Sequence, residues 1–343
     1  MQNGEETKQR VVVLPEQPKK KRYKGFLIFL GLLAALGLFA LLMIMQRETS
    51  DDPYEIEDEP YVAVMYIEGE IGDSNYDSLG YPYGYQHDWT LDQLDQLAYD
   101  SYNRGILFYV DSPGGTIYHS DELYLAIREY RETTGRPVYV YMGPYGTSGA
   151  YYASVSADRI FANRNTWTGS IGVTIGTMFD FSQLLENYGI QHHTIDSGEM
   201  KSVGNMWDEL TEEQEAYLQG LVDESYEQFV AIVTEERHMT VEEVKKLADG
   251  RMYTARQAKE LGLIDEIGTM EDAMKEMRRE YGLWDCDFTD VYYEFDYEPS
   301  VWDFLHMLTG KTDASSSQAQ ARVQSRSQTK TEYPLKYLCD ITE

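Results

Sequence analysis

An apolar segment near the N-terminus divides the chain. Residues 25–45 (GFLIFLGLLAALGLFALLMIM) are 21 consecutive uncharged, almost wholly apolar residues. About 20 such residues cross a bilayer as a helix, which satisfies its own backbone hydrogen bonds in lipid. Five basic residues lie within 19–24 and six acidic residues within 51–59, so the positive-inside rule places the N-terminus in the cytoplasm. We therefore expect a single-pass protein of the cell membrane, with a basic cytoplasmic tail at 1–24 and an extracytoplasmic remainder.

A cleaved signal peptide is the alternative interpretation of this segment. The apolar region of a signal peptide is shorter, roughly 7–15 residues, and is followed by small residues at the cleavage site. Residues 25–45 are longer, and Met43-Ile44-Met45-Gln46 is a poor cleavage site. The sequence therefore favours a retained transmembrane helix.

The charge and the cysteines exclude several classes of partner. Residues 1–24 carry seven basic and three acidic residues, whereas the rest carries 22 Lys and Arg against 56 Asp and Glu, a formal charge of −34. Such a surface repels nucleic acid, and ordinary solubility accounts for it. Cys286 and Cys339 are the only cysteines, so there is no disulfide framework, and whether the two pair is left open. No cysteine and histidine cluster indicates a metal.

The pattern from residue 60 onward predicts an α/β domain over 60–300, after an acidic linker at 46–59. The continuous apolar run 105–110 is typical of a strand buried on both faces, and strands alternate with helical patterns around it. The expected strands are 61–67, 105–110, 138–142 and 159–162, and the expected helices are 89–103, 117–133, a short one after Ser148, 175–188, 212–237, 241–248, 255–261 and 269–281.

Residues 301–343 read as a flexible C-terminal tail with an apolar end. Residues 311–332 are polar and of low complexity, without a periodic apolar face. Residues 333–338 (YPLKYL) are apolar and β-prone instead. We hypothesise that this end segment docks in a peptide groove, in its own or a neighbouring protomer, as a self-inhibitor or self-processing site; a frayed terminus is the alternative.

A glycine turn and a serine follow neighbouring strands. Gly114 and Gly115 come directly after the strand 105–110, and Ser148 follows the strand 138–142 and precedes a helix. The carboxyl ends of parallel strands carry the sites of open α/β sheets. We therefore expect Ser148 to be a nucleophile, with backbone N–H groups of Gly114, Gly115 and Gly149 as the oxyanion hole, although a glycine turn alone also arises for steric reasons.

The serine needs a base, and Lys201 is the better candidate. None of the six histidines stands in an obvious triad order, and we expect His119 to face outward from the start of its helix. A lysine acts as a base only where burial lowers its pKa well below about 10.4. A solvated surface lysine is the ordinary alternative. Ser170 is a candidate for orienting the neutral amine.

The motifs together resemble signal peptide peptidases of the SppA type, the protease IV family. The resemblance covers about residues 60–280 and is carried by DSPGG at 111–115, SDELYLAI at 120–127, GTSGAYYAS at 146–154, TGSIGV at 168–173, SGEMK at 197–201, LTEEQ at 210–214 and DGRMYTARQAKELGLIDEIG at 249–268. It implies a Clp protease/crotonase-like α/β fold, with Ser148 as nucleophile and Lys201 as general base. Ala150 stands where the family usually has a second glycine, and Met200 where an aromatic residue commonly precedes the lysine.

The resemblance implies endoproteolysis of remnant signal peptides and other unstructured apolar peptides. It also implies a ring-like or dome-like homo-oligomer and no metal or cofactor. Two alternatives remain: a crotonase-like acyl-CoA enzyme, which the extracytoplasmic placement disfavours, and a catalytically silent scaffold or regulator of membrane-protein turnover. Retention of both Ser148 and Lys201 argues against the silent scaffold.

Overall fold

The computed structural model describes Phe29, Gly31 and residues 59–74, 76, 82–293 and 336–338. The chain divides into the units Met1–Ile56 and Glu57–Glu343. In the first unit Phe29 and Gly31 are helical, and the expected membrane segment otherwise lies outside the described residues. Within the described part, no helix is long and apolar enough to cross a bilayer. The linker and most of the tail also lie outside it, so these boundaries stay predictions.

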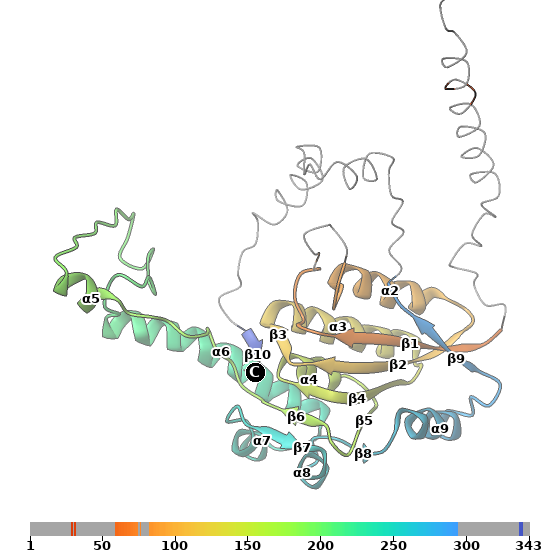
Figure 1. The fold of residues 1–343 in the computed structure, drawn as a ribbon. Coiled ribbons are helices and arrows are strands. Elements are labelled where there is room, and N and C mark those ends of the chain that lie inside the picture. Colours follow the sequence, from red (N-terminus) through yellow and green to blue (C-terminus); the bar gives the residue numbers. More distant parts are fainter. Residues whose placement is uncertain are drawn as a thin grey trace, which may run out of the picture. The chain divides into compact units, whose positions relative to one another are not determined.

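A mostly parallel sheet forms the centre of the second unit (Figure 1). The described strands run in the order β7-β6-β4-β2-β1-β9, with β5 and β8 attached beside β4. All of these pairs are parallel except β6 with β7. The strands are β1 (Tyr61–Glu68), β2 (Asn103–Ser112), β3 (Gly114–Thr116), β4 (Val138–Thr147), β5 (Arg159–Ala162), β6 (Trp167–Gly169), β7 (Met252–Thr254), β8 (Glu266–Ile267), β9 (Asp287–Val291) and β10 (Lys336–Leu338).

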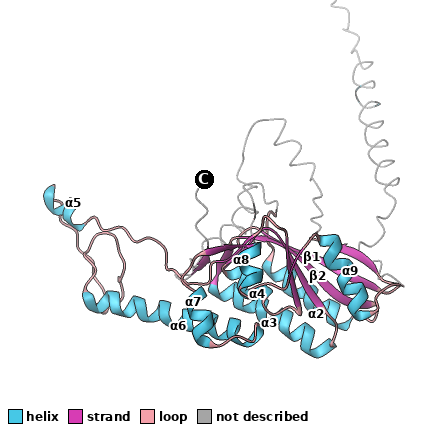
Figure 2. Ribbon diagram, turned by 90° about the horizontal axis from the view of Figure 1, so that it is seen from below, coloured by secondary structure: helices cyan, strands magenta, loops and turns pink. Residues whose placement is uncertain are grey.

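Helices cover both faces of this sheet (Figure 2). Along β1, Met65 points into the core under α2, α3 and α4, whereas Val62 points into the core under α9. This alternation is the two-residue period of a strand buried on both faces. The helices are α2 (His87–Tyr99), α3 (Ile117–Thr134), α4 (Gly149–Ser154), α5 (Ser182–Asn187), α6 (Glu212–Glu236), α7 (Val241–Leu247), α8 (Ala255–Glu260) and α9 (Met270–Tyr281).

The segment from β6 to the first half of α6 extends away from the sheet, and we call residues 174–217 the arm (Figures 1 and 2). No residue of α5 is buried, and the buried residues of α6 all lie at its C-terminal end. The helix α6 is about 37 Å long at 1.5 Å per residue. Because only its C-terminal end is buried against the domain, its first half projects from it. A reciprocal hydrogen-bond cap between Thr211 and Gln214 closes its first turn, and Gln214 Nε2 also donates to the carbonyl of Glu199 at 3.3 Å.

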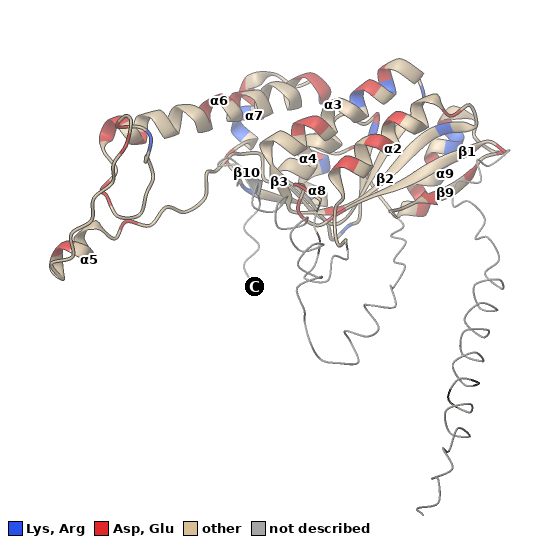
Figure 3. Cartoon of the chain, turned by 90° about the horizontal axis from the view of Figure 1, so that it is seen from above, with Lys and Arg blue, Asp and Glu red and all other residues tan. Residues whose placement is uncertain are grey.

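Most expected elements are present, with several differences. The helix expected at 89–103 ends at Tyr99, and Asn103 begins β2. The strand expected at 138–142 continues to Thr147, and the helix expected at 175–188 is confined to Ser182–Asn187. Several short strands after residue 162 were not expected. Acidic side chains lie along α2, α3 and α6 (Figure 3), in keeping with the charge of the sequence. Cys286 is buried with a free thiol, whereas Cys339 lies outside the described residues.

Candidate active site

Ser148 stands at the corner where β4 ends and α4 begins. Its backbone has φ 54° and ψ −120°, a conformation that residues other than glycine rarely adopt. The side chain is fully buried, and its Oγ has no hydrogen-bond partner among the described residues. Backbone strain of this kind persists only where the surroundings enforce it, and it gathers at functional sites. A strained, buried and unbonded hydroxyl is the strongest chemical feature of this sheet edge.

Two backbone hydrogen bonds hold this corner. The Ser148 N–H donates to the carbonyl of Gly169 at 2.8 Å, and the Ser148 carbonyl accepts from the N–H of Tyr152 at 2.9 Å within α4. The first bond continues the pairing of β4 with β6, which is why β4 runs on to Thr147. The corner is therefore fixed from both the strand and the helix.

The glycine turn lies directly beside Ser148. A Cβ on Gly149 would stand 2.2 Å from Ser120 Oγ and 3.1 Å from the backbone nitrogen of Gly115. The backbones of Gly149 and Gly115 thus approach each other with no room for a side chain. Gly114 has φ 99°, and its N–H donates to Ser112 Oγ at 3.1 Å. Of the three expected oxyanion donors, the structure brings Gly115 and Gly149 together and commits the N–H of Gly114 to Ser112.

The loop that follows β1 also holds Gly115 in place, through backbone hydrogen bonds of Ile71 to the residues on either side of Gly115. The N–H of Ile71 donates to the carbonyl of Gly114 at 2.8 Å, and the Ile71 carbonyl accepts from the N–H of Thr116 at 2.9 Å. A Cβ on Gly115 would stand 1.8 Å from that Ile71 oxygen. This close approach fixes the position of β3.

We expect Gly115→Ala to lower the free energy of unfolding by about 3 kcal/mol and to abolish activity, because backbone must move to admit the methyl group. Gly72→Ala is the matched control, since a Cβ on Gly72 meets nothing within 4 Å. Thermal unfolding and peptide hydrolysis measure the two effects. Equal behaviour of the two variants would contradict this account of β3.

Lys201 lies on the arm and is not brought to Ser148 within one chain. Its side chain is exposed, and its backbone N–H closes a turn onto the carbonyl of Gly198 at 3.0 Å. Among the described residues its ammonium takes part in no hydrogen bond or ion pair with another side chain. The expected pairing of this serine with this lysine is therefore not formed inside a single protomer.

Ser170 lies next to the residue that binds the Ser148 N–H. It has φ 50°, a second strained position, and its Oγ donates to the carbonyl of Gly250 at 3.2 Å. A cavity of about 320 Å³ opens beside it, lined in part by Tyr226 and Asp249. Its hydroxyl oxygen keeps acceptor capacity toward a group that enters from this side.

The expectation that His119 faces outward is wrong. Its ring is 3% exposed, with Nδ1 at 2.6 Å from Thr116 Oγ1 and Nε2 at 3.3 Å from a carboxylate oxygen of Asp73. The ring also packs edge-on against His87, at 4.5 Å between centroids. The loop after β1 covers this end of α3, which the helical pattern of the sequence could not show. His119 therefore packs against the end of β3 through Thr116, and it is not placed as a base for Ser148.

Burial, and then the neighbouring His87, lower the pKa of His119 below its ordinary value. The folded state thus holds the neutral ring, while the unfolded chain takes up a proton as the pH falls through about 6.5. Stability should therefore decrease between pH 7.5 and 5.5, above the range in which Glu122, whose pKa is lowered, titrates. We expect a flatter dependence of the urea midpoint in His119→Gln. Parallel curves for the two proteins would contradict the assignment.

The end of the chain pairs with the glycine turn. The strand β10 runs antiparallel to β3, with Lys336 opposite Thr116, Tyr337 opposite Gly115 and Leu338 opposite Gly114. It also lies beside α3 and α4. The pairing places residues 336–338 against β3, the strand that contains the candidate oxyanion donor Gly115.

The sequence did not single out Ile71, Ser112 or Ser120. Ile71 clasps β3, Ser112 Oγ donates to the carbonyl of Gly69 at 2.5 Å, and Ser120 Oγ donates to the carbonyl of Thr116 at 2.7 Å. Ser112 and Ser120 lie inside two of the quoted motifs, which was the available signal. Nothing local marks Ile71, because its role depends on a contact 44 positions along the chain.

Comparison with known proteins finds peptidases. A family model described as Peptidase family S49 matches residues 131–283, a range that includes Ser148, Ser170 and Lys201. The chain is 33% identical to a candidate protease of Methanocaldococcus jannaschii over 77% of this chain and 87% of that protein. It is 36% identical to a candidate signal peptide peptidase SppA of Enterococcus faecium over 66% of this chain and 65% of that protein.

More distant relatives are similar over smaller shares of their length. The chain is 28% identical to Protease 4 of Salmonella typhi, over 75% of this chain and 40% of that protein. Among solved structures, a mutant of a membrane-bound stomatin-specific protease matches with 14% identity and a TM-score of 0.42, over 69% of this chain and 99% of that one. ClpP1 from Listeria monocytogenes matches with 18% identity and a TM-score of 0.39, over 62% of this chain and 94% of that one.

Proposed function

Because the chain belongs to peptidase family S49 of the SppA type, we propose that it is a membrane-anchored serine endopeptidase with a Ser148 and Lys201 dyad. Its substrates are remnant signal peptides and other unstructured apolar peptides. The observation that carries the proposal is Ser148 itself, a strained and buried hydroxyl without a hydrogen bond, beside the approaching backbones of Gly115 and Gly149.

The reaction proceeds through an acyl-enzyme. Ser148 Oγ attacks the scissile carbonyl carbon while the neutral amine of Lys201 takes the hydroxyl proton. Backbone N–H groups of Gly149 and Gly115 stabilise the tetrahedral oxyanion. The Lys201 ammonium then gives its proton to the leaving amine as the peptide bond breaks. Water then attacks the ester carbon as the Lys201 amine takes its proton, and the Lys201 ammonium gives that proton to Ser148 Oγ as the ester bond breaks.

We propose that Lys201 reaches Ser148 from a neighbouring protomer. The arm that carries Lys201 projects from its own domain (Figures 1 and 2). Large apolar side chains on it are exposed in the single chain. Contiguous exposed apolar surface marks protein–protein contact. Contact with a second copy would remove water from the ammonium and favour the neutral amine. The exposed arm residues include Met178, Phe179, Leu184, Tyr188, Ile190, Ile195, Met206, Trp207 and Tyr217.

The substrate binds as an added strand. The antiparallel pairing of β10 with β3 supports this mode, because main-chain hydrogen bonds to a strand edge accept an extended peptide of many sequences. Folded segments cannot present such a strand, so unstructured peptides are favoured. The tail segment 333–338 then competes with substrate in its own or a neighbouring protomer.

Deleting residues 311–343 is expected to raise kcat/KM for short peptides several-fold, because a tethered segment competes at an effective concentration in the millimolar range. The matched control keeps the tail length and replaces 333–338 by glycine and serine. Both variants should be faster than the wild type, and a wild-type chain that shortens during incubation would indicate self-processing. Unchanged rates and unchanged chain length would count against the tail as competitor.

The peptidase proposal is tested by incubating residues 46–343 with a panel of apolar, signal-derived peptides and following cleavage by mass spectrometry. Cleavage inside the apolar stretch is the expected result. A folded, assembled protein that cleaves none of them, even after removal of the tail, would instead favour a scaffold or regulator of membrane-protein turnover. Membrane anchoring and an extracytoplasmic domain belong to the same proposal, and protease protection of the full chain in sealed vesicles tests them.

A further inference from the structure

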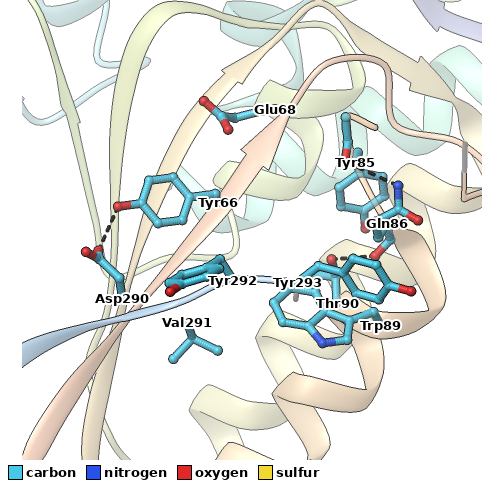
Figure 4. A pocket seen from close by; sticks show the side chains of 11 residues that line it. Tyr66, Glu68, Tyr85, Gln86, Trp89, Thr90, Asp290, Val291, Tyr292 and Tyr293 are labelled. Carbon is cyan, nitrogen blue, oxygen red and sulfur yellow. Dashed lines mark hydrogen bonds between the residues drawn. The ribbon is translucent and has the colours of Figure 1, made fainter. Parts of the chain in front are cut away.

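An aromatic pocket lies at the β1 and β9 edge of the sheet, outside the dyad and the glycine turn (Figure 4). Its volume is about 380 Å³, within the range of sites for small ligands or single side chains. Five aromatic rings line it, from β1, from the start of α2 with the loop before it, and from the end of β9. We call it the aromatic cage, and its rings are Tyr66, Tyr85, Trp89, Tyr292 and Tyr293.

Two carboxylates complete the cage, and no basic side chain is among the described residues that line it. The Tyr66 hydroxyl donates to Asp290 Oδ1 at 2.7 Å, which fixes the ring and the carboxylate together. Glu68 forms no ion pair with a described residue. Its carboxylate lies on the side of the pocket that Tyr66 lines (Figure 4). Trp89 packs edge-on against Tyr293, at 5.8 Å between centroids. The walls therefore combine ring faces with two carboxylates that form no ion pair with a described basic residue.

This combination selects an organic cation. Ring faces attract ammonium and guanidinium groups through their quadrupole, and the carboxylates add charge complementarity. A divalent metal ion needs several converging oxygen ligands, and the described residues contain no group of three or more His, Cys, Asp or Glu that could hold one. An anion would be repelled by both carboxylates. Burial and Asp290 raise the pKa of Tyr66 to about 12, so its hydroxyl stays a donor at neutral pH.

One wall of the cage, Glu68, lies close along the chain to Ile71, which pairs with Gly115 of the glycine turn. Glu68 ends β1, and three residues later Ile71 clasps Gly115. An extended chain covers at most about 3.6 Å per residue, so the Cα atoms of Glu68 and Ile71 are within about 11 Å of each other. Four extended residues of a substrate span a comparable length, at about 3.3 Å each.

We propose that the aromatic cage binds the guanidinium or ammonium group of an arginine or lysine side chain on the peptide whose scissile bond lies at Ser148. This inference rests on the proposed peptidase function. It gives that function a second recognition element, because a cationic side chain of the substrate is held in the cage while apolar residues lie at the nucleophile.

The test compares apolar peptides that differ only in one arginine or its uncharged isostere citrulline, placed at successive positions on either side of the cleaved bond. At one spacing the wild-type full chain should show a KM about tenfold lower for arginine, with kcat little changed, since the cage acts on binding. Asp290→Asn and Trp89→Leu should remove most of this preference, and 0.5 M salt should weaken it.

Asp287→Asn is the matched control. Asp287 lies on the same strand as Asp290 and is exposed, but it does not line the cage, so the arginine preference should persist. Asp290→Asn keeps an oxygen that accepts the hydrogen bond from the Tyr66 hydroxyl, so the local fold should be retained. Equal KM values for arginine and citrulline at every spacing would overturn the proposal. An arginine preference that survives both cage substitutions would overturn it as well.

A binding measurement separates this inference from the peptidase proposal. Acetyl-arginine amide and acetyl-citrulline amide are titrated into the Ser148→Ala full chain, and tryptophan fluorescence and ligand NMR report binding. Selective binding of the arginine probe that is lost in Asp290→Asn supports the cage even if no peptide is cleaved. Cleavage of uncharged peptides without selective probe binding supports the peptidase and overturns the cage.

Discussion

Ser148→Ala is expected to lower kcat/KM for apolar peptides by about 10⁴-fold or more, to the background left by binding and the oxyanion hole. The methyl group fits the space of the hydroxymethyl group, and the unbonded Oγ gives up no hydrogen bond to a described residue. The melting temperature should therefore stay within a few degrees of the wild type. Hydrolysis rates and calorimetry on the same preparation measure both quantities.

Ser154→Ala is the control for this variant. It makes the same substitution at the other end of α4, in an equally buried side chain whose Oγ donates to the carbonyl of Ala150 at 2.6 Å. Its activity should stay within a few-fold of the wild type, although its stability falls by about 1 kcal/mol. A Ser148→Ala protein that cleaves peptides at the wild-type rate would contradict the assignment of Ser148 as the nucleophile.

Lys201→Ala and Lys201→Arg are both expected to lower kcat/KM by about 10³-fold, because loss of general base catalysis costs 10²–10⁴ and arginine stays protonated. The exposed position of Lys201 predicts unchanged folding of the isolated protomer. Lys245→Ala is the control, since Lys245 is another exposed lysine, which pairs with Glu227 at 2.6 Å. Its rate should match the wild type.

Mixing the two inactive chains tests where the lysine comes from. If Lys201 acts on the Ser148 of a neighbour, random assembly of Ser148→Ala with Lys201→Ala chains restores up to about a quarter of the sites, those in which each neighbour supplies its intact residue. If the lysine acted within its own chain, every site would lack one group and the mixture would stay inactive. Co-expression with two affinity tags isolates the mixed assemblies for this assay.

The central elements could be predicted because their signals are local. The apolar run at 105–110 and the helical pattern at 117–133 correspond to β2 and α3, and Gly135 ends α3 in the left-handed conformation. The strands of two to five residues after 162 carry too little periodicity to be recognised. The expected helix at 175–188 shrinks to α5, because no residue of α5 is buried in its own chain and packing is the usual support of a helix.

In the candidate site, too, only the residues with local sequence signals could be predicted. Ser148, Gly115 and Gly149 follow adjacent parallel strands, so chain order alone predicts that they meet. The distance between Lys201 and Ser148 depends on how protomers assemble, which no local pattern encodes. His119 and the aromatic cage depend on the loop after β1, whose sequence shows no periodic pattern. Their roles come from contacts that this loop makes with β3, α2 and β9.

The position of β1 in the sheet constrains the order in which the molecule can be made. It lies between β2 and β9, and Tyr61 pairs with Asp287 although 225 residues separate them. A chain still being synthesised therefore exposes one edge of an apolar parallel strand until almost the whole domain has emerged. Exposed edges of this kind recruit other chains, and such long-range pairing forms slowly. Truncation before β9 should thus yield an aggregating product, and protection of β1 by a chaperone during synthesis would be of direct advantage to this protein.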